Sequence, residues 1–276
     1  MLSKFYIKDH VKSALQEDIG FGDITTENLA EETDYLNGEL NTRNDGILCG
    51  CEVFKTVYET LSDKVKINFY FKDGDKIKKG DKLADIEGPA KELLMGERVA
   101  LNYIQRMSGI ATETRKYQDA IGNNKAKIVD TRKTTPNFRA FEKYSVKTGG
   151  GALHRFNLSD CAMIKDNHIR LAGSITKAVN KLRKNISHAH KIEVECDTLE
   201  QVKEAVEVKA DIIMLDNMDI QTMREACNII SDKAIVEASG NVTLETVGNI
   251  ASTGVDIISS SAIVAKAPTL DIALDM

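Results

Sequence analysis

The sequence lacks several features that would place it in a whole class of proteins. No stretch approaches the run of about eighteen apolar residues that a membrane helix needs. The N-terminal segment MLSKFYIKDHVKSALQED mixes charged and apolar residues, so it lacks the apolar core of a secretory signal. The net charge is -5, which provides no excess of basic residues for nucleic acid or an anionic membrane. These absences predict a cytoplasmic protein that binds neither nucleic acid nor membrane.

Cysteine is scarce and shows no paired pattern. The cysteines are Cys49, Cys51, Cys161, Cys196 and Cys227, an odd number without a CxxC motif. This pattern predicts buried, reduced thiols rather than disulfides or a zinc site.

The first half of the chain combines a β-rich region with a long helix. The 276 residues suffice for one large domain or two unequal ones. After an N-terminal helix, residues 36–50 and 65–86 alternate apolar and polar residues, with turns at Asp73-Gly74 and Lys79-Gly80. This stretch resembles the hammerhead of biotinyl and lipoyl domains, but without their exposed lysine tip it favours a scaffold over a swinging-arm carrier. Apolar residues at helical spacing predict one helix over 90–120 that links two domains.

The second half alternates short β-branched runs with amphipathic helices. The runs are KIVDTRK, CAMIKDNH, KIEVECD, DIIMLDN, AIVEASG and VDIISSS. Near-continuous apolar strands with helical crossovers indicate parallel strands that are buried on both faces, and a βα barrel is their natural closed form. Thr198 and Gln201 form a predicted capping box, while Asp219 and Thr243 are predicted caps of the next two helices.

Each predicted strand ends in a polar or charged residue. These residues are Asp130 to Lys133, Lys165, Glu195, Asp216, Glu237 with Ser239, and Ser259. In a βα barrel the carboxyl ends of the strands form the active-site face, so we expect these side chains to converge on one mouth.

The predicted mouth carries charges of both signs. Its cations are Arg132, Lys133, Arg155 and Lys165, with His154 beside them, and its anions are Glu195 and Asp216. Clustered cations indicate a polyanionic ligand, and arginine binds carboxylate or phosphate through paired hydrogen bonds. The two acids indicate Mg²⁺ or sugar hydroxyls as their partners. The glycines of 149–151, and the turn Ser239-Gly240-Asn241 at an expected helix start, suit a phosphate.

These segments are recognisable together. TRKTTP (131–136), KTGGGALHR (147–155) and MIKDNH (163–168) closely resemble signature segments of the quinolinate phosphoribosyltransferases. Further similar segments are EDIGFGDITT (17–26), GERVALNYIQRMSGIAT (96–112), IEVECDTLEQ (192–201), IIMLDN (212–217) and EASGNV (237–242). The similarity covers essentially the whole chain, in order.

The resemblance implies an α/β protein with two domains. It implies an N-terminal open-faced α/β sandwich over residues 1–108 and a C-terminal incomplete βα barrel over residues 109–276. It further implies a homodimer or higher homo-oligomer with shared active sites, in which Arg98 binds quinolinate in the partner's site. The implied reaction joins quinolinate to the phosphoribosyl group of 5-phosphoribosyl 1-diphosphate, with loss of carbon dioxide, on the way to NAD.

The resemblance also implies roles for the residues of the mouth. The residues expected at quinolinate are Arg132, Arg155 and Lys165 for its two carboxylates, with Thr131 and His154 lining the pocket. Lys133 is expected at quinolinate or the diphosphate, and Glu195 and Asp216 at the ribose hydroxyls and Mg²⁺. The residues expected around the 5-phosphate are Ser239, Gly240 and Asn241, and Ser259 and Ser261 are further expected substrate-binding residues.

Three positions depart from the usual family pattern. Asn137 and Ser261 stand where the family usually has glycine, and Leu153 stands where it usually has asparagine. Ser261 bears on the phosphate subsite, which a side chain at this position would narrow.

Other functions remain open from the sequence. One is a paralogue associated with molybdenum transport that uses a different acceptor. Another is a barrel lyase with Lys165 as a Schiff base, because neighbouring cations such as Arg132 and Arg155 activate a lysine amine. A third, from the hammerhead-like stretch, is a carrier or binding module.

Overall fold

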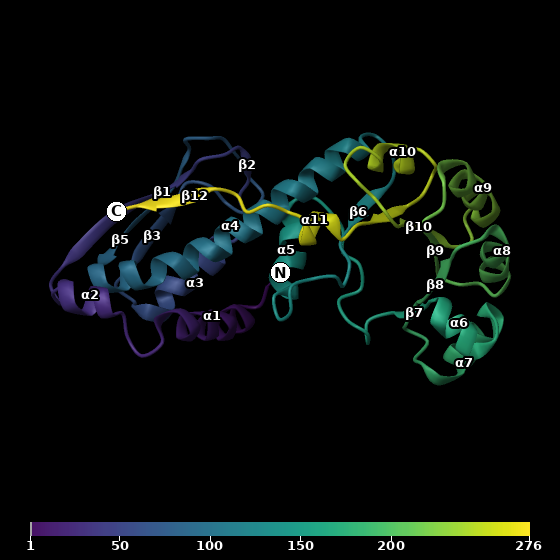
Figure 1. Ribbon diagram of the computed structural model, residues 1–276, viewed down its shortest axis with the longest axis horizontal. Helices are drawn as coiled ribbons and strands as arrows, with labels where there is room; N and C mark the ends of the chain where they lie inside the picture. The colour runs from purple at the N-terminus through teal and green to yellow at the C-terminus, as the bar shows by residue number, and fades with distance from the viewer. Residues whose placement is uncertain (1) are drawn as a thin grey trace. The chain divides into compact units, whose positions relative to one another are not determined.

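A computed structural model describes residues 2–276, which divide into two compact units. The first unit comprises the chain up to Arg115, Pro136–Gly150 and Ala267–Met276, and the second comprises Lys116–Thr135 and Gly151–Lys266. The long helix α4 (Ala90–Ile121), which the sequence predicts over 90–120, runs along the chain from the first unit into the second (Figure 1).

The first unit is an antiparallel sheet covered by helices. Its strand order is β12-β1-β5-β3, and a second pair joins β2 to β4. The strands are β1 (Tyr35–Thr42), β2 (Gly46–Ile47), β3 (Lys66–Phe69), β4 (Lys76–Ile77), β5 (Lys82–Pro89) and β12 (Ile272–Asp275). The helices are α1 (Lys4–Ile19), α2 (Ile24–Leu29), α3 (Cys51–Leu61) and α5 (Arg139–Thr148), together with the first part of α4. The N-terminal helix and the β-rich region that the sequence predicts are confirmed.

Asp73 connects three parts of this unit. Its carboxylate accepts the backbone N–H groups of Gly50 and Cys51, each at 3.0 Å, and the hydroxyl of Tyr144 at 2.8 Å. The predicted turn after Asp73 has Gly74 in the left-handed region at φ 95°. This one carboxylate therefore joins the start of α3 to α5 through a turn between strands.

Small residues of α4 let the chain pack closely. The Ser108 hydroxyl bonds to the backbone of Cys49, accepting its N–H at 2.9 Å and donating to its carbonyl at 3.1 Å. At Gly109, an added Cβ would lie 2.0 Å from the carbonyl oxygen of Pro268. The backbone that leads to β12 therefore passes directly over the glycine.

Gly109→Ala is expected to destabilise the protein by about 3 kcal/mol, because the new methyl group forces α4 away from the C-terminal segment. Urea unfolding followed by circular dichroism measures the change. Lys8→Ala, at an exposed position of α1, is the matched control and should alter stability by less than about 0.5 kcal/mol. Equal unfolding midpoints for Gly109→Ala and the wild type would contradict this packing.

The second unit is the predicted incomplete barrel. Within residues 2–276, six parallel strands form one sheet in the order β6-β11-β10-β9-β8-β7. They are β6 (Lys127–Val129), β7 (Ala162–Ile164), β8 (Ile192–Cys196), β9 (Ile212–Asp216), β10 (Ile235–Ser239) and β11 (Ile257–Ser259). The strands β6 and β7 stand at the two ends of this order, so the sheet curves without closing through a β6–β7 ladder.

Helices follow the barrel strands along the chain. They are α6 (Asp166–Ala172), α7 (Ile175–Asn185), α8 (Leu199–Glu207), α9 (Ile220–Ile230), α10 (Val247–Ala251) and α11 (Ala262–Ala265). Figure 1 shows α7, α8 and α9 on the outer side of β7, β8 and β9. The strands consequently have one face against helices and one facing the barrel interior.

Two of the three predicted helix caps are confirmed. The Thr198 hydroxyl accepts the N–H of Gln201 at 3.3 Å. The Gln201 side chain accepts from the N–H of Asp197 rather than of Thr198, so the second half of the predicted capping box is not formed. The Asp219 carboxylate caps α9 by accepting two N–H groups. The prediction for Thr243 is wrong, because the turn at 244–246 delays the start of α10 to Val247 and leaves Thr246 at the cap position.

The same delay corrects a second expectation. Ser239-Gly240-Asn241 ends β10 but does not begin a helix, since α10 starts only at Val247. Any anion at this turn is therefore bound by loop backbone and side chains rather than by a helix terminus.

The cysteines are unpaired, as expected. Cys49 and Cys196 are buried and the other three are half-buried. Burial raises the pKa of the Cys161 thiol to about 11. Among residues 2–276, no helix combines the length and apolar character that a membrane span requires.

Candidate active site

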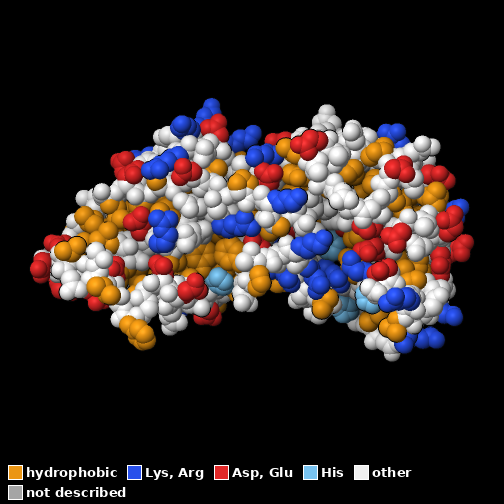
Figure 2. All heavy atoms as spheres, in the orientation of Figure 1, with side chains coloured by type: hydrophobic (Ala, Val, Ile, Leu, Met, Phe, Trp, Pro, Cys, Tyr) orange, Lys and Arg blue, Asp and Glu red, His pale blue; other side chains and the backbone are white. Residues whose placement is uncertain are grey.

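A cavity of about 650 Å³ lies in the barrel unit. It lies at the carboxyl ends of the strands, where a βα barrel builds its active site. The predicted residues that line it are Thr131, Arg132, Lys133, His154, Arg155, Lys165, Glu195, Asp216, Ser239, Gly240, Asn241, Ser259 and Ser261. Figure 2 shows basic and acidic side chains lying next to each other on the visible face of this unit. Arg98 is not among the lining residues; it is exposed on α4 in the first unit.

The inward side chains form two layers because alternate residues of a strand share one face. The upper layer consists of the strand-end residues Lys165, Glu195, Asp216, Ser239 and Ser259, which reach the cavity. Two residues earlier on the same strands come Met163, Glu193, Met214, Glu237 and Ile257. The carboxylates of Glu193 and Glu237 thus lie beneath a layer that already contains those of Glu195 and Asp216.

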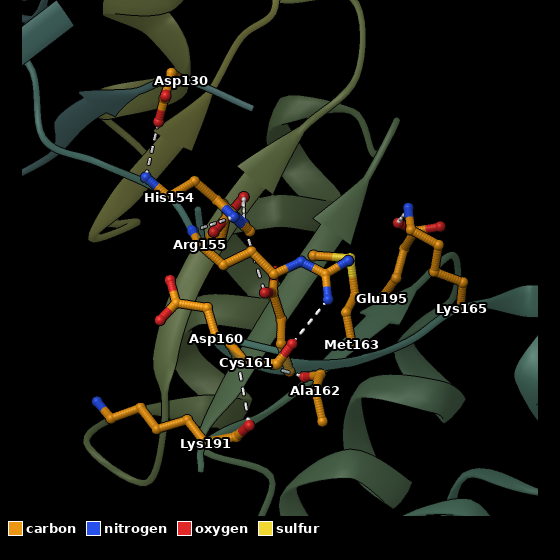
Figure 3. A network of polar contacts seen from close by, with 12 residues as sticks. Asp130, His154, Arg155, Asp160, Cys161, Ala162, Met163, Lys165, Lys191 and Glu195 are labelled. Atoms are coloured by element: carbon orange, nitrogen blue, oxygen red, sulfur yellow. Dashed lines mark hydrogen bonds and ion pairs between the residues drawn. The ribbon is translucent and has the colours of Figure 1, made fainter. Parts of the chain in front are cut away.

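Lys165 and Glu195 form an ion pair across neighbouring strand ends. The Lys165 Nζ lies 2.5 Å from Glu195 Oε2, with the lysine side chain 44% exposed and the glutamate 16% exposed. Figure 3 shows the two side chains meeting. An anion that binds to Lys165 must therefore share this ammonium with Glu195, or displace the carboxylate.

The guanidinium group of Arg155 is held in place by contacts of both its Nη atoms. Its Nη1 donates to the Cys161 carbonyl at 2.8 Å, and its Nη2 lies 3.5 Å from Met163 Sδ. The following residue is anchored as well, because the Phe156 N–H donates to the Asp160 carboxylate at 2.8 Å. A flexible side chain on an irregular segment is thereby given a defined direction at the cavity wall (Figure 3).

His154 lies between buried carboxylates. Its Nε2 is 3.5 Å from Glu193 Oε2 and 3.4 Å from Glu237 Oε1. Burial lowers the pKa of His154, whereas its interactions with Glu193 and Glu237 raise it. Burial also raises the pKa of Glu193. Nitrogen and oxygen atoms of the three side chains all lie within 4.8 Å of one another, close enough for a metal-ligand set.

The opposite end of the cavity is built from loops with left-handed backbone. Gly240 has φ 97° and Asn241 has φ 50°. The Asn217 side chain donates to Asp216 Oδ2 at 2.8 Å and accepts from Asn241 Nδ2 at 3.0 Å. A Cβ at Gly240 would lie 2.2 Å from Asn217 Oδ1, so only glycine fits there. This network sets the direction of Asp216.

The comparisons with known proteins decide the family. The N-terminal domain model described as "Quinolinate phosphoribosyl transferase, N-terminal domain" matches residues 23–108. The corresponding C-terminal domain model matches residues 110–275. The chain belongs to the quinolinate phosphoribosyltransferase family.

Relatives of this family resemble the chain over nearly its whole length. A probable nicotinate-nucleotide pyrophosphorylase [carboxylating] of Bacillus subtilis is 43% identical over 94% of this chain and 90% of its own. Quinolinate phosphoribosyltransferase [decarboxylating] 2b of Nicotiana tabacum is 38% identical over 97% of this chain and 81% of its own. The solved nicotinate-nucleotide pyrophosphorylase of Francisella tularensis superposes with a TM-score of 0.96 at 38% identity, covering 100% of this chain and 97% of that one.

The departure from the family pattern at Ser261 causes no backbone strain. Ser261 has φ -75° and ψ -18°, a right-handed helical conformation that any residue adopts. Its side chain therefore changes the lining of the cavity but not the path of the loop.

Some residues that line the cavity are not predicted from the sequence. They are Met163, Met214, Asn217, Val242, Ser260, Ala262 and Lys266. The position of Asn217 could have predicted that it lines the cavity, since it follows Asp216 directly at a strand end. No sequence pattern predicts that Lys266 lines the cavity, because it comes after α11 and its approach to the cavity depends on how that short helix lies. Glu193 alternates with Glu195 in IEVEC. This pattern predicts that both side chains lie on the same face of the strand, but not how deeply Glu193 is buried.

Proposed function

We propose that this chain catalyses the decarboxylating transfer of the phosphoribosyl group from 5-phosphoribosyl 1-diphosphate to quinolinate. The products are nicotinate mononucleotide, diphosphate and carbon dioxide, a step of NAD biosynthesis. The observation that carries the proposal is the barrel cavity of a family member, in which Arg132, Lys133, Arg155 and Lys165 line one space together with acidic strand-end residues. The family assignment favours this reaction over a molybdenum-transport paralogue or a Schiff-base lyase.

Quinolinate binding follows from the cations. Its two adjacent carboxylates need several positive groups in one pocket, and Arg132, Arg155 and Lys165 supply them. Each charge-assisted hydrogen bond contributes on the order of 1.5–3 kcal/mol. Arg155 enters the pocket with its guanidinium already oriented by Cys161 and Met163, so less side-chain freedom is lost on binding.

The first chemical step is a displacement at C1 of the ribose. The bond from C1 to the diphosphate oxygen breaks with its electron pair leaving on the diphosphate, and the pyridine nitrogen forms a bond to C1. Lys133 stabilises the leaving diphosphate, while Glu195 and Asp216 stabilise the positive charge that develops on the ribose. Most of the acceleration comes from positioning the reactants and from fixed charges, since no covalent intermediate with the protein is required.

Decarboxylation follows from the new positive charge on the ring nitrogen. The bond between C2 and its carboxylate breaks, its electron pair is stabilised on the cationic ring, and a proton from solvent takes the vacated position. The cations that hold the remaining 3-carboxylate keep the ring in place during this step.

The acidic lining suits a magnesium ion. Asp216 and Glu195 present hard carboxylate oxygens to the cavity, the donor type that Mg²⁺ prefers beside a diphosphate. When bound, the ion would neutralise charge on the diphosphate. Asn217 holds the Asp216 carboxylate in one orientation, ready for a cation or a sugar hydroxyl.

The proposed function is tested with purified protein, quinolinate, phosphoribosyl diphosphate and Mg²⁺. Chromatography should detect nicotinate mononucleotide only when all three are present, and Arg132→Ala should remove it. A folded protein that yields no product would contradict the proposed function.

Removal of the metal provides a second prediction. Treatment with EDTA followed by desalting is expected to stop product formation, and added Mg²⁺ should restore it, because the leaving diphosphate needs charge neutralisation. The stopped enzyme should keep its far-UV circular dichroism spectrum, which separates loss of the ion from unfolding. Full activity in the presence of excess EDTA would rule out the magnesium requirement.

We further propose that the chain forms a homodimer or higher homo-oligomer in which Arg98 serves the partner's cavity. Arg98 is exposed on α4, where it is available to a second copy. If it acts across subunits, Arg98→Ala and Lys165→Ala should each be inactive. Refolding a mixture of the two should return about a quarter of the activity, because half of the dimers are mixed and each has one intact site.

A matched mixture controls for this complementation. Arg132→Ala and Lys165→Ala both damage the cavity of a single chain, so their mixture should stay inactive. Mixed dimers of Arg98→Ala and Lys165→Ala that form but remain inactive would show that Arg98 does not act in the partner's site.

A further inference from the structure

Two buried glutamates beneath the cavity have no role in the proposed reaction. Glu193 and Glu237 are each 1% exposed. They precede Glu195 and Ser239 by two residues on β8 and β10, so they point to the same interior face one layer lower. Burying a carboxylate is costly unless it is paired and hydrogen-bonded, so two such groups in one layer require a specific partner.

That partner is His154. Its Nε2 lies 3.5 Å from a carboxylate oxygen of Glu193 and 3.4 Å from one of Glu237, while the ring is only 10% exposed. The imidazole therefore has one edge directed at the two glutamates rather than into the cavity. Among residues 2–276, Glu193 Oε1 and Glu237 Oε1 have no hydrogen-bond partner, so the contacts of the two carboxylates with His154 are electrostatic. Glu193 also interacts electrostatically with Arg155.

The ring transmits this placement to the adjacent arginine. The Arg155 backbone N–H donates to His154 Nδ1 at 2.8 Å, which assigns the ring proton to Nε2, the nitrogen that faces the two glutamates. The His154 backbone N–H donates to Asp130 Oδ1 at 2.9 Å. Residues 153–155 lie outside any helix or strand, so no regular hydrogen-bond ladder sets their direction. Glu193 of β8 and Glu237 of β10 do this instead, together with Asp130, which follows β6. Figure 3 shows Asp130 bonded to the backbone of His154.

We infer that Glu193 and Glu237 are positioning residues for the quinolinate end of the cavity, acting through His154 on Arg155. The inference rests on the proposed function. Its effect should be confined to one end, because the loops at the other end are held by a separate network, that of Asn217 with Asp216 and Asn241.

The test compares Glu193→Gln and Glu237→Gln with the wild type. Both changes keep the side-chain volume and remove one charge. The KM for quinolinate is expected to rise about 10- to 100-fold, the scale of losing a polar contact with a charged group. The KM for phosphoribosyl diphosphate should stay within about twofold, and the melting temperature should show a folded protein. Glu200→Gln, on the outer helix α8, is the matched control and should change neither constant.

Further variants keep the test decisive if a glutamine variant folds poorly. Glu237→Asp retains the charge but withdraws it from His154, so its KM for quinolinate should fall between those of the wild type and Glu237→Gln. His154→Gln should reproduce the selective rise.

Several results would overturn the inference. They are an unchanged KM for quinolinate in folded variants, an equal rise in both KM values, and a stoichiometric metal in the wild type that both glutamine variants lose. The last result would assign the three side chains to a metal site. An inactive wild type would instead refute the proposed function, so the two failures are distinguishable.

Discussion

Replacing Lys165 with alanine is expected to abolish turnover while the fold persists. The ammonium group lies 2.5 Å from Glu195 and lines the cavity at the end of β7. Without it, the Glu195 carboxylate stays where the carboxylates of quinolinate must approach, and like charges repel. We expect kcat/KM for quinolinate to fall by about 10³-fold, as for the loss of a preorganised charge at a reacting centre.

The fold should survive this change because the lysine side chain is 44% exposed and contributes little packing. Steady-state kinetics and thermal melting measure the two effects separately. Lys203→Ala, at an exposed position of α8, is the control for the loss of a lysine as such. Catalytic efficiency within a few-fold of the wild type in Lys165→Ala would contradict the role of this side chain.

Gly240→Ala is expected to damage the other end of the cavity. The new Cβ would lie 2.2 Å from Asn217 Oδ1 and 2.9 Å from the Asn217 backbone nitrogen, so the loop or Asn217 must move. Because Asn217 orients Asp216 and bonds to Asn241, the movement reaches the groups proposed to bind the ribose and its phosphate. We expect kcat/KM for phosphoribosyl diphosphate to fall about 10²-fold, the cost of a misplacement of about 1 Å.

Gly122→Ala separates crowding from backbone strain. Gly122 also has a left-handed φ, 64°, but an added Cβ there meets no atom within 4 Å. Its alanine variant should therefore lose some stability and keep the kinetic constants. If Gly240→Ala showed the same pattern, the contact with Asn217 would not govern binding at this end.

The strand-end residues show how far the sequence reaches toward the cavity. Lys165, Glu195 and Asp216 were predicted to converge because each ends an apolar run, and parallel strands of one barrel present their carboxyl ends on one side. The prediction depended on several strands ending in the same way, since a single polar residue after one strand is equally typical of a solvated loop. Motif resemblance then supplied the family, which the domain models confirm.

Long-range pairing was beyond the sequence patterns. The segment Ile272–Asp275 is β12, and its partner is β1, where Glu39 pairs with Asp275. The local sequence does not predict which distant strand will pair with such a short segment. The error at Thr243 is of the opposite kind, because a good cap residue was present but an intervening turn moved the helix start to Val247.

The sequence by itself determined the six alternating strands of the barrel, the charges at the strand ends and the family. These depend on local periodicity and on residue types that follow one another in the chain. Only the tertiary structure decided that Glu193 lies buried against His154 while Glu195 reaches Lys165, two residues later on the same strand. Alternation along a strand gives both glutamates the same face, but their depth in the barrel, and hence their dielectric surroundings and partners, depends on the neighbouring strands.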